Sequence, residues 1–473
     1  MSVSAVPAAE DGAGLAVPIA VPVPFRDPLA LFAPLAHLPW SVLLDSAEEH
    51  AARGRHAYIA VDPYDTILAA FDDPIDPFAV LRAKLPLGLA PALPGLPPFQ
   101  GGALGLFGYE LGGIFERFPA PRATVPSVPD MAVGLYDTVA AFDLAGRKAW
   151  VLARDVPGAP GHRPPARIRA ETLAAKLRAA PALGLPDWSV RGTWRAETDR
   201  ARFEAMVARA VEYIRAGDIF QANVTQRFLA EIPSGLDPFT LYRRLRRLSP
   251  SPFAAYVNAP GVRMLSASPE RFLALDRSGR IETRPIKGTR PRGADPAEDA
   301  RFVAELRASE KDRAENLMIV DLLRNDLSRV SAIGSVRVPE LFTLETFARV
   351  HHLVSAVEGR LAPGANALDL IAAAFPGGSV TGAPKIRAVE IIHELEPARR
   401  GPYCGSLAWI GFDGAMDSSI VIRTLWLAEG LAVAQAGGGI VADSVPAAEY
   451  EETMVKAAPL LAALAGEPPG SGT

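Results

Sequence analysis

The sequence predicts an α+β protein, because strand-like runs come in consecutive groups and helix-like runs come in separate blocks. Near the C-terminus, apolar runs are divided by the turn signals Asp413-Gly414 and Glu429-Gly430, which is typical of an antiparallel meander. The strands expected there span 405–410, 419–428 and 431–436. Apolar residues recur at helical spacing in three blocks, at about 297–307, 310–324 and 366–374.

The composition limits the class of protein. The chain has 473 residues, 49% of them hydrophobic, which is enough to bury a large core. A net charge of −4 without clustered lysine and arginine gives no footprint for nucleic acid. A single cysteine, Cys404, rules out an internal disulfide and fits a reducing cytoplasm. No run of about 18 apolar residues occurs, so we expect no transmembrane helix and no membrane partner.

The first half of the chain reads as a tail followed by an N-terminal region at 25–185. We expect residues 1–24 to be a disordered tail rather than a signal peptide, because Glu10 and Asp11 precede the apolar run. The elements expected next are strands at Ser41–Ser46 and His56–Asp62, a glycine-rich strand at Pro98–Glu110 and a helix around 167–181. The glycines lack the Gly-x-Gly-x-x-Gly spacing of a dinucleotide loop.

The second region, residues 195–465, opens with an amphipathic helix from Asp199 to Arg215 that Gly217 ends. A strand is expected from Ile219 to Ile232. The apolar face of the helix consists of Phe203, Met206, Val207, Ala210, Val211 and Ile214.

A hairpin is predicted just before Lys287, from the runs Arg271–Asp276 and Arg280–Thr283. Lys287 follows at its exit, between an apolar residue and a glycine, which indicates a placed amine. A free lysine is only about 0.04% neutral at pH 7, so a nucleophilic lysine needs burial or a neighbouring positive charge. The alternative is a surface lysine in a basic loop. The residues that could supply the positive charge are Arg284, Arg290 and Arg292.

Acidic side chains on two predicted helices could meet at one cation. Glu449, Glu452 and Lys456 lie at positions i, i+3 and i+7 and therefore share one helix face, whereas Glu451 points elsewhere. Glu315 opens another helix, and Mg²⁺ prefers carboxylate oxygens of this kind. The alternative is two solvated helix faces. The apolar side of the second helix would be Leu317, Val320, Leu323 and Leu327.

Several motifs resemble the chorismate-utilising enzyme family, and within it the aminodeoxychorismate synthase component I group. Pro285-Ile286-Lys287-Gly288-Thr289 resembles the signature of that group, whereas anthranilate synthases typically have alanine at the lysine position. Further motifs match in family order at Ser268–Phe272, Lys311–Asp321, Arg324–Asp326, Val350–Ser355, Phe375–Lys385 and Ala436–Ser444. The resemblance implies large antiparallel β-sheets sandwiched between helices, with the two halves of the chain interleaved.

The resemblance implies that the protein converts chorismate and ammonia to 4-amino-4-deoxychorismate, toward 4-aminobenzoate and folate. Lys287 would attack C2 while the C4 hydroxyl leaves with help from Glu270, and ammonia would then add at C4 and displace the lysine. An ion pair with Arg271 is the alternative for Glu270. His352 matches the active-site histidine of the family, and His351 matches no known role.

Substrate and metal ligands are implied in the same way. Tyr403 and Arg423 match the residues that bind the enolpyruvyl carboxylate, although each could be an ordinary strand residue. Further substrate contacts are expected from Thr381, Lys385, Lys456 and a backbone anion nest at Gly437, Gly438 and Gly439. Mg²⁺ would bind Glu315 and Glu452, with Glu449 nearby, and would hold the ring carboxylate.

A tryptophan site is the second ligand site that the resemblance implies. Asp45 and Ser46 end a segment similar to the element that binds tryptophan in this family. Pro252 and Phe253 belong to a segment similar to its Pro-Ser-Pro-aromatic partner. The alternative is an ordinary strand end.

The source of ammonia is expected to be a separate glutamine amidotransferase subunit. A glutaminase needs an activated cysteine, and Cys404 lies inside the expected chorismate site. Two rival functions are anthranilate synthase component I, against which Lys287 argues, and a non-catalytic regulatory subunit that binds chorismate or tryptophan. The second rival would be expected to lose Lys287, Glu315 or Glu452.

Overall fold

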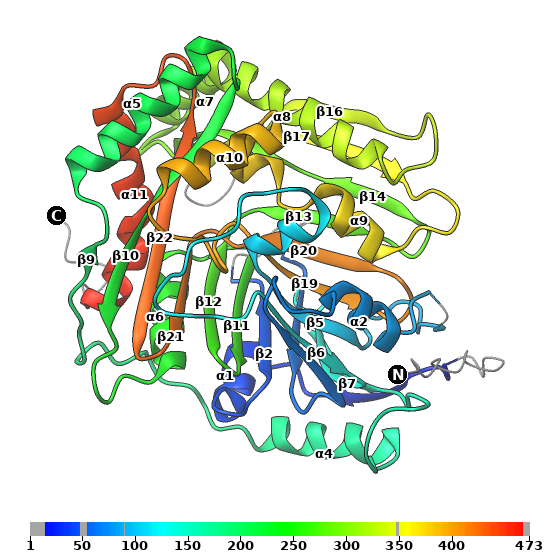
Figure 1. Ribbon diagram of the computed structural model, residues 1–473. Helices are drawn as coiled ribbons and strands as arrows, with labels where there is room; N and C mark the ends of the chain where they lie inside the picture. The colour runs from blue at the N-terminus through cyan, green and yellow to red at the C-terminus, as the bar shows by residue number, and fades with distance from the viewer. Residues whose placement is uncertain (1–14, 48–53, 89, 347–349, 467–473) are drawn as a thin grey trace, which may run out of the picture.

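Two large antiparallel sheets form the centre of the computed structural model, which describes residues 15–47, 54–88, 90–346 and 350–466. Within those ranges one sheet has 12 strands and the other has 10. The predicted α+β class with antiparallel sheets between helices is confirmed (Figure 1).

The 12-stranded sheet combines strands from both halves of the chain. Its order is β1 (Ile19–Val23), β8 (Lys148–Ala153), β7 (Thr138–Asp143), β3 (His56–Ala60), β2 (Ser41–Asp45), β11 (Phe253–Ala259), β12 (Val262–Ser268), β21 (Thr424–Ala428), β22 (Leu431–Ile440), β10 (Gln221–Glu231) and β18 (Gly382–Ala383), and β9 (Arg195–Ala196) pairs with β10. The two halves meet where β2 pairs with β11.

The 10-stranded sheet is interleaved in the same way, because β5 of the first half pairs with β19 of the second. Its order is β15 (Ile286–Pro291), β17 (Val350–Arg360), β14 (Arg280–Thr283), β13 (Arg271–Leu275), β20 (Met416–Ile420), β19 (Ser406–Gly411), β5 (Gly102–Phe107), β6 (Met131–Tyr136) and β4 (Asp65–Ala69), and β16 (Arg337–Thr346) pairs with β17. The predicted hairpin before Lys287 is confirmed as β13 and β14.

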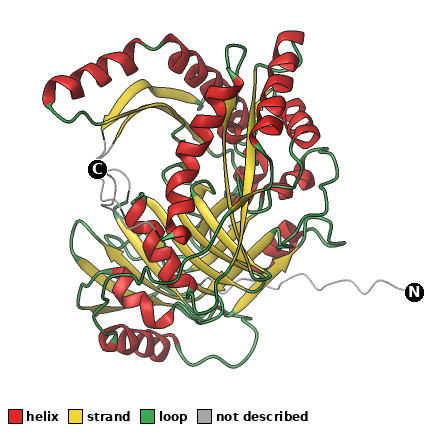
Figure 2. Cartoon of the chain, turned by 90° about the vertical axis from the view of Figure 1, so that its left-hand side faces the viewer, coloured by secondary structure: helices red, strands yellow, loops and turns green. Residues whose placement is uncertain are grey.

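Successive side chains of each strand point to opposite faces of the 12-stranded sheet, so this sheet contributes to one hydrophobic core on each face. Val42 of β2 packs with Leu104 and Trp409 of the other sheet, whereas its neighbour Leu43 packs with the helices outside. The helices of that outer cluster are α1 (Pro28–Phe32), α4 (Ala166–Ala179), α6 (Pro238–Leu248) and α11 (Pro446–Ala465). Figure 2 shows the strands inside and most helices on the outside.

The other helices are α2 (Pro77–Lys84), α3 (Gly112–Phe115), α5 (Arg200–Ala216), α7 (Pro296–Ala308), α8 (Glu310–Ser328), α9 (Ala367–Ala374) and α10 (Lys385–Leu395). Of these, α5 and α10 pack on β10 of the 12-stranded sheet, and α8 packs on β17 of the 10-stranded sheet. The predicted helix that begins after Asp199 is confirmed, because Asp199 accepts a hydrogen bond from the Arg202 amide and Gly217 ends the helix with φ of +86°. Short 3₁₀ turns are η1 (Ala33–Leu35), η2 (Tyr109–Leu111) and η3 (Gly378–Val380).

Two expectations about chain organisation are wrong in part. Residues 1–14 lie outside the described ranges, but Ile19–Val23 form β1, which pairs with β8 and is therefore not part of a disordered tail. The expected strand at 419–428 is two strands, because the chain leaves β20 in one sheet and enters β21 in the other. The expected meander is therefore two hairpins, β19–β20 and β21–β22, in different sheets.

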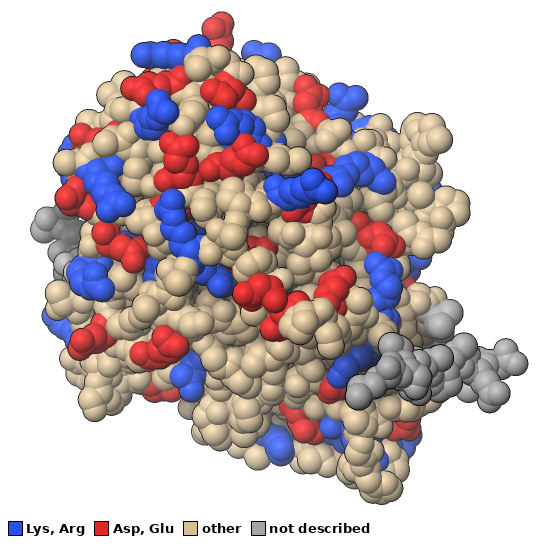
Figure 3. All heavy atoms as spheres, in the orientation of Figure 1, with Lys and Arg blue, Asp and Glu red and all other residues tan. Residues whose placement is uncertain are grey.

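The surface carries both signs of charge. Figure 3 shows lysine and arginine interspersed with aspartate and glutamate over the face in view. In the described part of the chain, none of the helices has the length and apolar character needed to cross a bilayer.

Candidate active site

Lys287 lies in a β-bulge at the start of β15. Ile286 pairs with Val354 of β17 and Thr289 pairs with His352, so β15 carries an extra residue between the two pairs. Gly288 takes a left-handed φ of +81° there. A bulge redirects the side chain that it carries, which explains how an edge strand can aim a lysine away from the regular pleat. A Cβ on Gly288 would lie 2.9 Å from Asp312 Cγ, so the glycine also lets α8 approach.

Carboxylates and a second amine surround Lys287. Glu315, Glu270 and Glu452 interact electrostatically with the Lys287 ammonium, as does Lys456 with the opposite effect. Burial lowers the pKa of Lys287, and the positive charge of Lys456 lowers it further. A lower pKa increases the fraction of neutral amine, which is the form that attacks an electrophile.

The prediction that nearby arginines supply the positive charge beside Lys287 is wrong. The three nearby arginines are all in ion pairs: Arg284 with Glu340 and Glu345 at 2.7 Å, Arg290 with Asp312 at 3.2 Å, and Arg292 with Asp299 at 2.8 Å. Burial and Lys456, from a helix far away in the sequence, perturb Lys287 instead.

Glu270 lies between β12 and β13, and only 8% of its surface is exposed. Its negative charge raises the pKa of Lys287 and so opposes the effect of burial there. The neighbouring Arg271 binds Asp417 at 2.9 Å and Glu282 at 3.1 Å.

One face of α11 carries the predicted acidic and basic groups to β22. A Cβ on Gly438 would lie 3.3 Å from Glu449 Oε2, 3.5 Å from Lys456 Nζ and 3.8 Å from Glu452 Oε1. Lys456 donates to the Gly437 carbonyl at 3.0 Å and pairs with Glu452 at 2.7 Å. Any side chain at 438 would therefore crowd these three groups. Glu451 pairs with Arg200 elsewhere, as expected.

Glu315 reaches the same place from α8. Asn316 fastens that helix to the sheet by accepting a hydrogen bond from Ser355 of β17 at 2.5 Å. Burial raises the pKa of Glu315, the negative charge of Glu449 raises it further, and Lys287 and Lys311 oppose this. The predicted apolar side of the helix is wrong at Leu317, which is 45% exposed; the buried positions include Ile319 and Val320.

The carboxylates are suited to one divalent cation but do not form a closed cage. Among the described residues, no group of three histidine, cysteine, aspartate or glutamate side chains is close enough to hold a metal alone. Glu449 and Glu452 of α11 lie at Gly438, and the negative charge of Glu449 also raises the pKa of Glu315 of α8. Mg²⁺ typically binds one or two carboxylates and takes its remaining ligands from water and substrate, so this donor set fits it.

Tyr403 and Arg423 are brought together by the hairpin of β19 and β20. Two hydrogen bonds close its base, from Cys404 N to the Val421 carbonyl at 2.8 Å and from Val421 N to the Gly405 carbonyl at 2.9 Å. Arg423, with φ of +51°, sits where the chain crosses between sheets and donates to the Lys456 carbonyl at 2.7 Å. Burial lowers the pKa of Arg423, and Tyr403 and Glu452 oppose this.

The two adjacent histidines have different environments. His352 is partly exposed, and its Nδ1 lies 2.8 Å from the Thr289 hydroxyl, two residues beyond Lys287. His351 is buried between Thr346 and Asp299, with contacts of 2.9 Å to each. His351 therefore has a structural place, and His352 is the one that faces the Lys287 strand.

Three of the expected substrate contacts are arranged differently. The Lys385 ammonium binds Asp326 and the Ala374 carbonyl, both at 2.8 Å, and the buried Thr381 hydroxyl donates to the Gly377 carbonyl at 3.0 Å. Gly437–Gly439 form part of β22 and pair with Thr225, Val224 and Asn223, so the expected nest is wrong. A nest needs alternating helical backbone, whereas strand pairing keeps these glycines extended.

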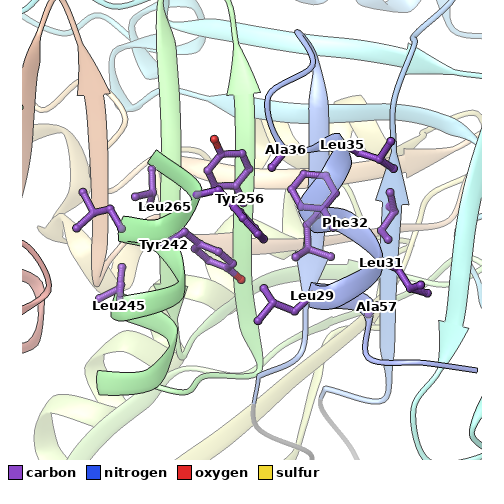
Figure 4. Packing of buried hydrophobic residues seen from close by; sticks show 14 of the residues in the cluster. Leu29, Leu31, Phe32, Leu35, Ala36, Ala57, Tyr242, Leu245, Tyr256 and Leu265 are labelled. Carbon is purple, nitrogen blue, oxygen red and sulfur yellow. The ribbon is translucent and has the colours of Figure 1, made fainter. Parts of the chain in front are cut away.

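The proposed tryptophan segments do meet, but their polar groups already have partners. Ser46 donates to the His56 carbonyl at 2.8 Å and to the Pro252 carbonyl at 3.4 Å. The Asp45 carboxylate accepts from the Tyr242 hydroxyl at 3.0 Å and pairs with Arg246. The Tyr256 ring packs between those of Tyr242 and Phe32, and its centroid lies 5.7 Å from the centroid of each (Figure 4).

Sequence reasoning missed a buried network behind the site. The Arg400 guanidinium pairs with Glu396 at 2.7 Å and donates to the carbonyls of Val380 and Asn223 at 2.8 Å. Gln221 lies against Gly439, and among the described residues neither polar atom of its amide has a hydrogen-bond partner. Nothing in the local spacing of these residues signals a role, because their partners come from other elements.

The interleaved sheets and the charged side chains around Lys287 fit an enzyme, and comparison with known proteins shows its family. The chain belongs to the family of chorismate binding enzymes, and the match covers residues 41–462. Aminodeoxychorismate synthase component 1 from Klebsiella aerogenes is 43% identical over 93% of this chain and 97% of its own. Anthranilate synthase component 1 from Streptomyces coelicolor is also 43% identical, over 89% of this chain and 83% of its own. Anthranilate synthase component I from Streptococcus pneumoniae has a similar solved structure, with a TM-score of 0.75 and 33% identity, covering 87% of this chain and 92% of that one.

Proposed function

We propose that this protein converts chorismate and ammonia to 4-amino-4-deoxychorismate for the synthesis of 4-aminobenzoate and folate. The observation that carries the proposal is Lys287, a partly buried amine in a bulge, surrounded by Glu270, Glu315 and Glu452. Overall identity does not choose between the two activities of the relatives, since both reach 43%. The lysine does, because only a covalent amine mechanism needs a nucleophile at this place.

The reaction proceeds in two displacements. Neutral Lys287 Nζ bonds to C2 of chorismate, the ring double bonds shift, and the C4–O bond breaks as Glu270 gives its proton to the leaving hydroxyl, releasing water. Ammonia then bonds to C4, the double bonds shift back, and the C2–Nζ bond breaks. The proton lost by the new amine returns to Glu270, which restores the starting state.

Other side chains bind and orient the substrate. Arg423 and Tyr403 bind the enolpyruvyl carboxylate, for which a guanidinium is suited. Glu315 and Glu452, with Glu449 beside them, would hold Mg²⁺, which neutralises and orients the ring carboxylate when bound. Lys456 adds positive charge near the same carboxylate, and His352 lies at the edge of the Lys287 strand.

The decisive experiment is product analysis with chorismate, Mg²⁺ and an ammonium salt. The expected product is 4-amino-4-deoxychorismate, identified by liquid chromatography and mass spectrometry. Anthranilate, which the Streptomyces relative's name specifies, would instead place the protein with that group.

Two partners complete the proposal. A separate glutamine amidotransferase supplies ammonia, which the name "component 1" of the relatives supports. Tryptophan binds at Asp45, Ser46, Pro252 and Phe253, which the meeting of Ser46 with Pro252 supports. Because Arg246 and Tyr242 now hold Asp45, tryptophan would have to displace one of them, and calorimetric titration with tryptophan tests this.

A further inference from the structure

The substrate-binding Tyr403 stands on a tight turn at residues 400–405. Tyr403 N donates to the Arg400 carbonyl at 3.1 Å, and Gly405 N donates to the Pro402 carbonyl at 3.0 Å. Gly401 and Cys404 both have left-handed backbone, with φ of +57° and +64°. For the non-glycine Cys404 this conformation is unfavourable, and hydrogen bonds with Val421 hold that end of the turn.

Glu110 holds the first residues of the same turn. Its two carboxylate oxygens accept hydrogen bonds from two consecutive amides of the turn, Arg400 N and Gly401 N, each at 2.9 Å. The backbone beside it adds a third bond, from Tyr109 N to the Gly401 carbonyl at 2.8 Å. Residues 109 and 110 therefore hold Arg400 and Gly401 by three hydrogen bonds, two from amides of the turn and one to a carbonyl of the turn.

Burial strengthens the hydrogen bonds that Glu110 makes to the turn, and the charges around Glu110 affect its protonation. Its side chain is only 8% exposed, and Arg399 Nε lies 3.8 Å from Oε2. Asp130, which pairs with Arg399, and Arg227 of β10 are the other charged groups that interact with it. Burial raises the pKa of Glu110 to about 7, Arg399 opposes this and Asp130 adds to it.

Glu110 also borders a pocket at the surface. The pocket has a volume of about 100 Å³ and is lined in addition by Tyr109, Arg399 and Arg400. The Arg400 guanidinium lies 4.9 Å from the Tyr109 ring, between this pocket and Cys404.

We propose that Glu110 is a positioning residue that sets Tyr403 for substrate binding by holding the amides of Arg400 and Gly401. The proposal rests on the proposed function, in which Tyr403 binds the enolpyruvyl carboxylate. When Glu110 is protonated, one oxygen becomes a hydroxyl and no longer accepts well from an amide. The turn is then held by fewer bonds, so chorismate binding weakens as the pH falls through about 7.

The test compares the wild type with Glu110→Gln, which keeps the shape but has a single acceptor oxygen. Equilibrium binding of chorismate is titrated from pH 6 to 8.5, alongside KM and kcat with ammonium. We expect Glu110→Gln to weaken binding and raise KM roughly five- to tenfold, with kcat changed by less than about twofold. We also expect wild-type binding to weaken below about pH 7, whereas the Gln variant is flat across this range.

Glu116→Gln is the matched control. Glu116 forms an ion pair with Arg329, with 2.9 Å between the charged atoms, and within the described part of the chain it makes no hydrogen bond or ion pair with residues 400–405. The Glu116→Gln variant should bind chorismate like the wild type. Thermal unfolding of each variant identifies any loss of fold. Glu110→Gln is preferred to Glu110→Ala because the near-isosteric glutamine is the substitution that is expected to fold. Wild-type affinity and pH dependence in Glu110→Gln would overturn the proposal. Chorismate binding without aminodeoxychorismate formation by the wild type would remove the proposed function, while the titration would still decide the role of Glu110.

Discussion

At the residue scale, the proposed chemistry depends on Lys287, whose positive charge burial disfavours. Burial and Lys456 lower the pKa of Lys287 below its usual 10.5, although Glu315, Glu270 and Glu452 oppose them. The activity should therefore rise with pH as the ammonium loses its proton, and level off at a lower pH than a free lysine would give.

Lys287→Ala should reduce aminodeoxychorismate formation by roughly 10³-fold, because the covalent route is lost. The wild type, denatured during turnover at low ammonia, should show a substrate adduct by mass spectrometry, and the variant should show none. Undiminished turnover in the variant at neutral pH would contradict the nucleophile assignment.

Glu315→Gln and Glu452→Gln should each raise the Mg²⁺ concentration needed for half-maximal activity by roughly tenfold, since each removes a charged ligand. Thermal unfolding should change little, because both side chains face a polar site. Glu451→Gln is the control on the same helix, where Glu451 pairs with Arg200 on another face. A wild-type activity that resists chelation would contradict the metal assignment.

At the element scale, the β-bulge of β15 carries Lys287, the proposed nucleophile. Gly288→Ala should cost about 1–2 kcal/mol from the left-handed φ alone, and its Cβ would also press against Asp312 and Leu306 at 2.9 Å. We expect a large loss of activity with only this modest loss of folding stability, because a change in the bulge also displaces Lys287. Gly334→Ala is the control, with φ of +77° and open space around it, and should keep full activity. Equal activity in the two variants would show that the bulge does not position Lys287.

At the scale of the whole molecule, interleaving makes the two halves depend on each other. A fragment of residues 195–466 would lose the pairing of β11 with β2 and of β19 with β5, which exposes the core between the sheets. We expect the fragment to lack cooperative unfolding in urea by circular dichroism, whereas the full chain should unfold cooperatively. A stable fragment with native-like spectra would contradict this reading of the sheet order.

The proposed dependence on a glutamine amidotransferase also belongs to the scale of the whole molecule. Cys404 is buried, and burial raises its pKa to about 12, so its thiol stays protonated and cannot act as a glutaminase nucleophile. The purified chain should use ammonium salts but not glutamine, and adding the amidotransferase should confer glutamine-dependent activity. Cys404→Ser should keep that activity. Glutamine use by the chain alone would contradict the prediction.

The sequence by itself determined the class, the family and the residue types of the site. Helical spacing put Glu449, Glu452 and Lys456 on one face, and short-range periodicity located most strands and helices, because these patterns depend only on neighbours along the chain. The hairpin before Lys287 and the end of α5 at Gly217 are of the same kind.

Only the tertiary structure decided what depends on residues far apart in the sequence. It showed that Lys456 rather than the nearby arginines perturbs Lys287, and that Gly437–Gly439 are strand rather than nest. It also placed β20 and β21 in different sheets and Glu110 under the Tyr403 turn. Burial, sheet pairing and ion pairing are set by three-dimensional neighbours, and no local pattern of residues contains them.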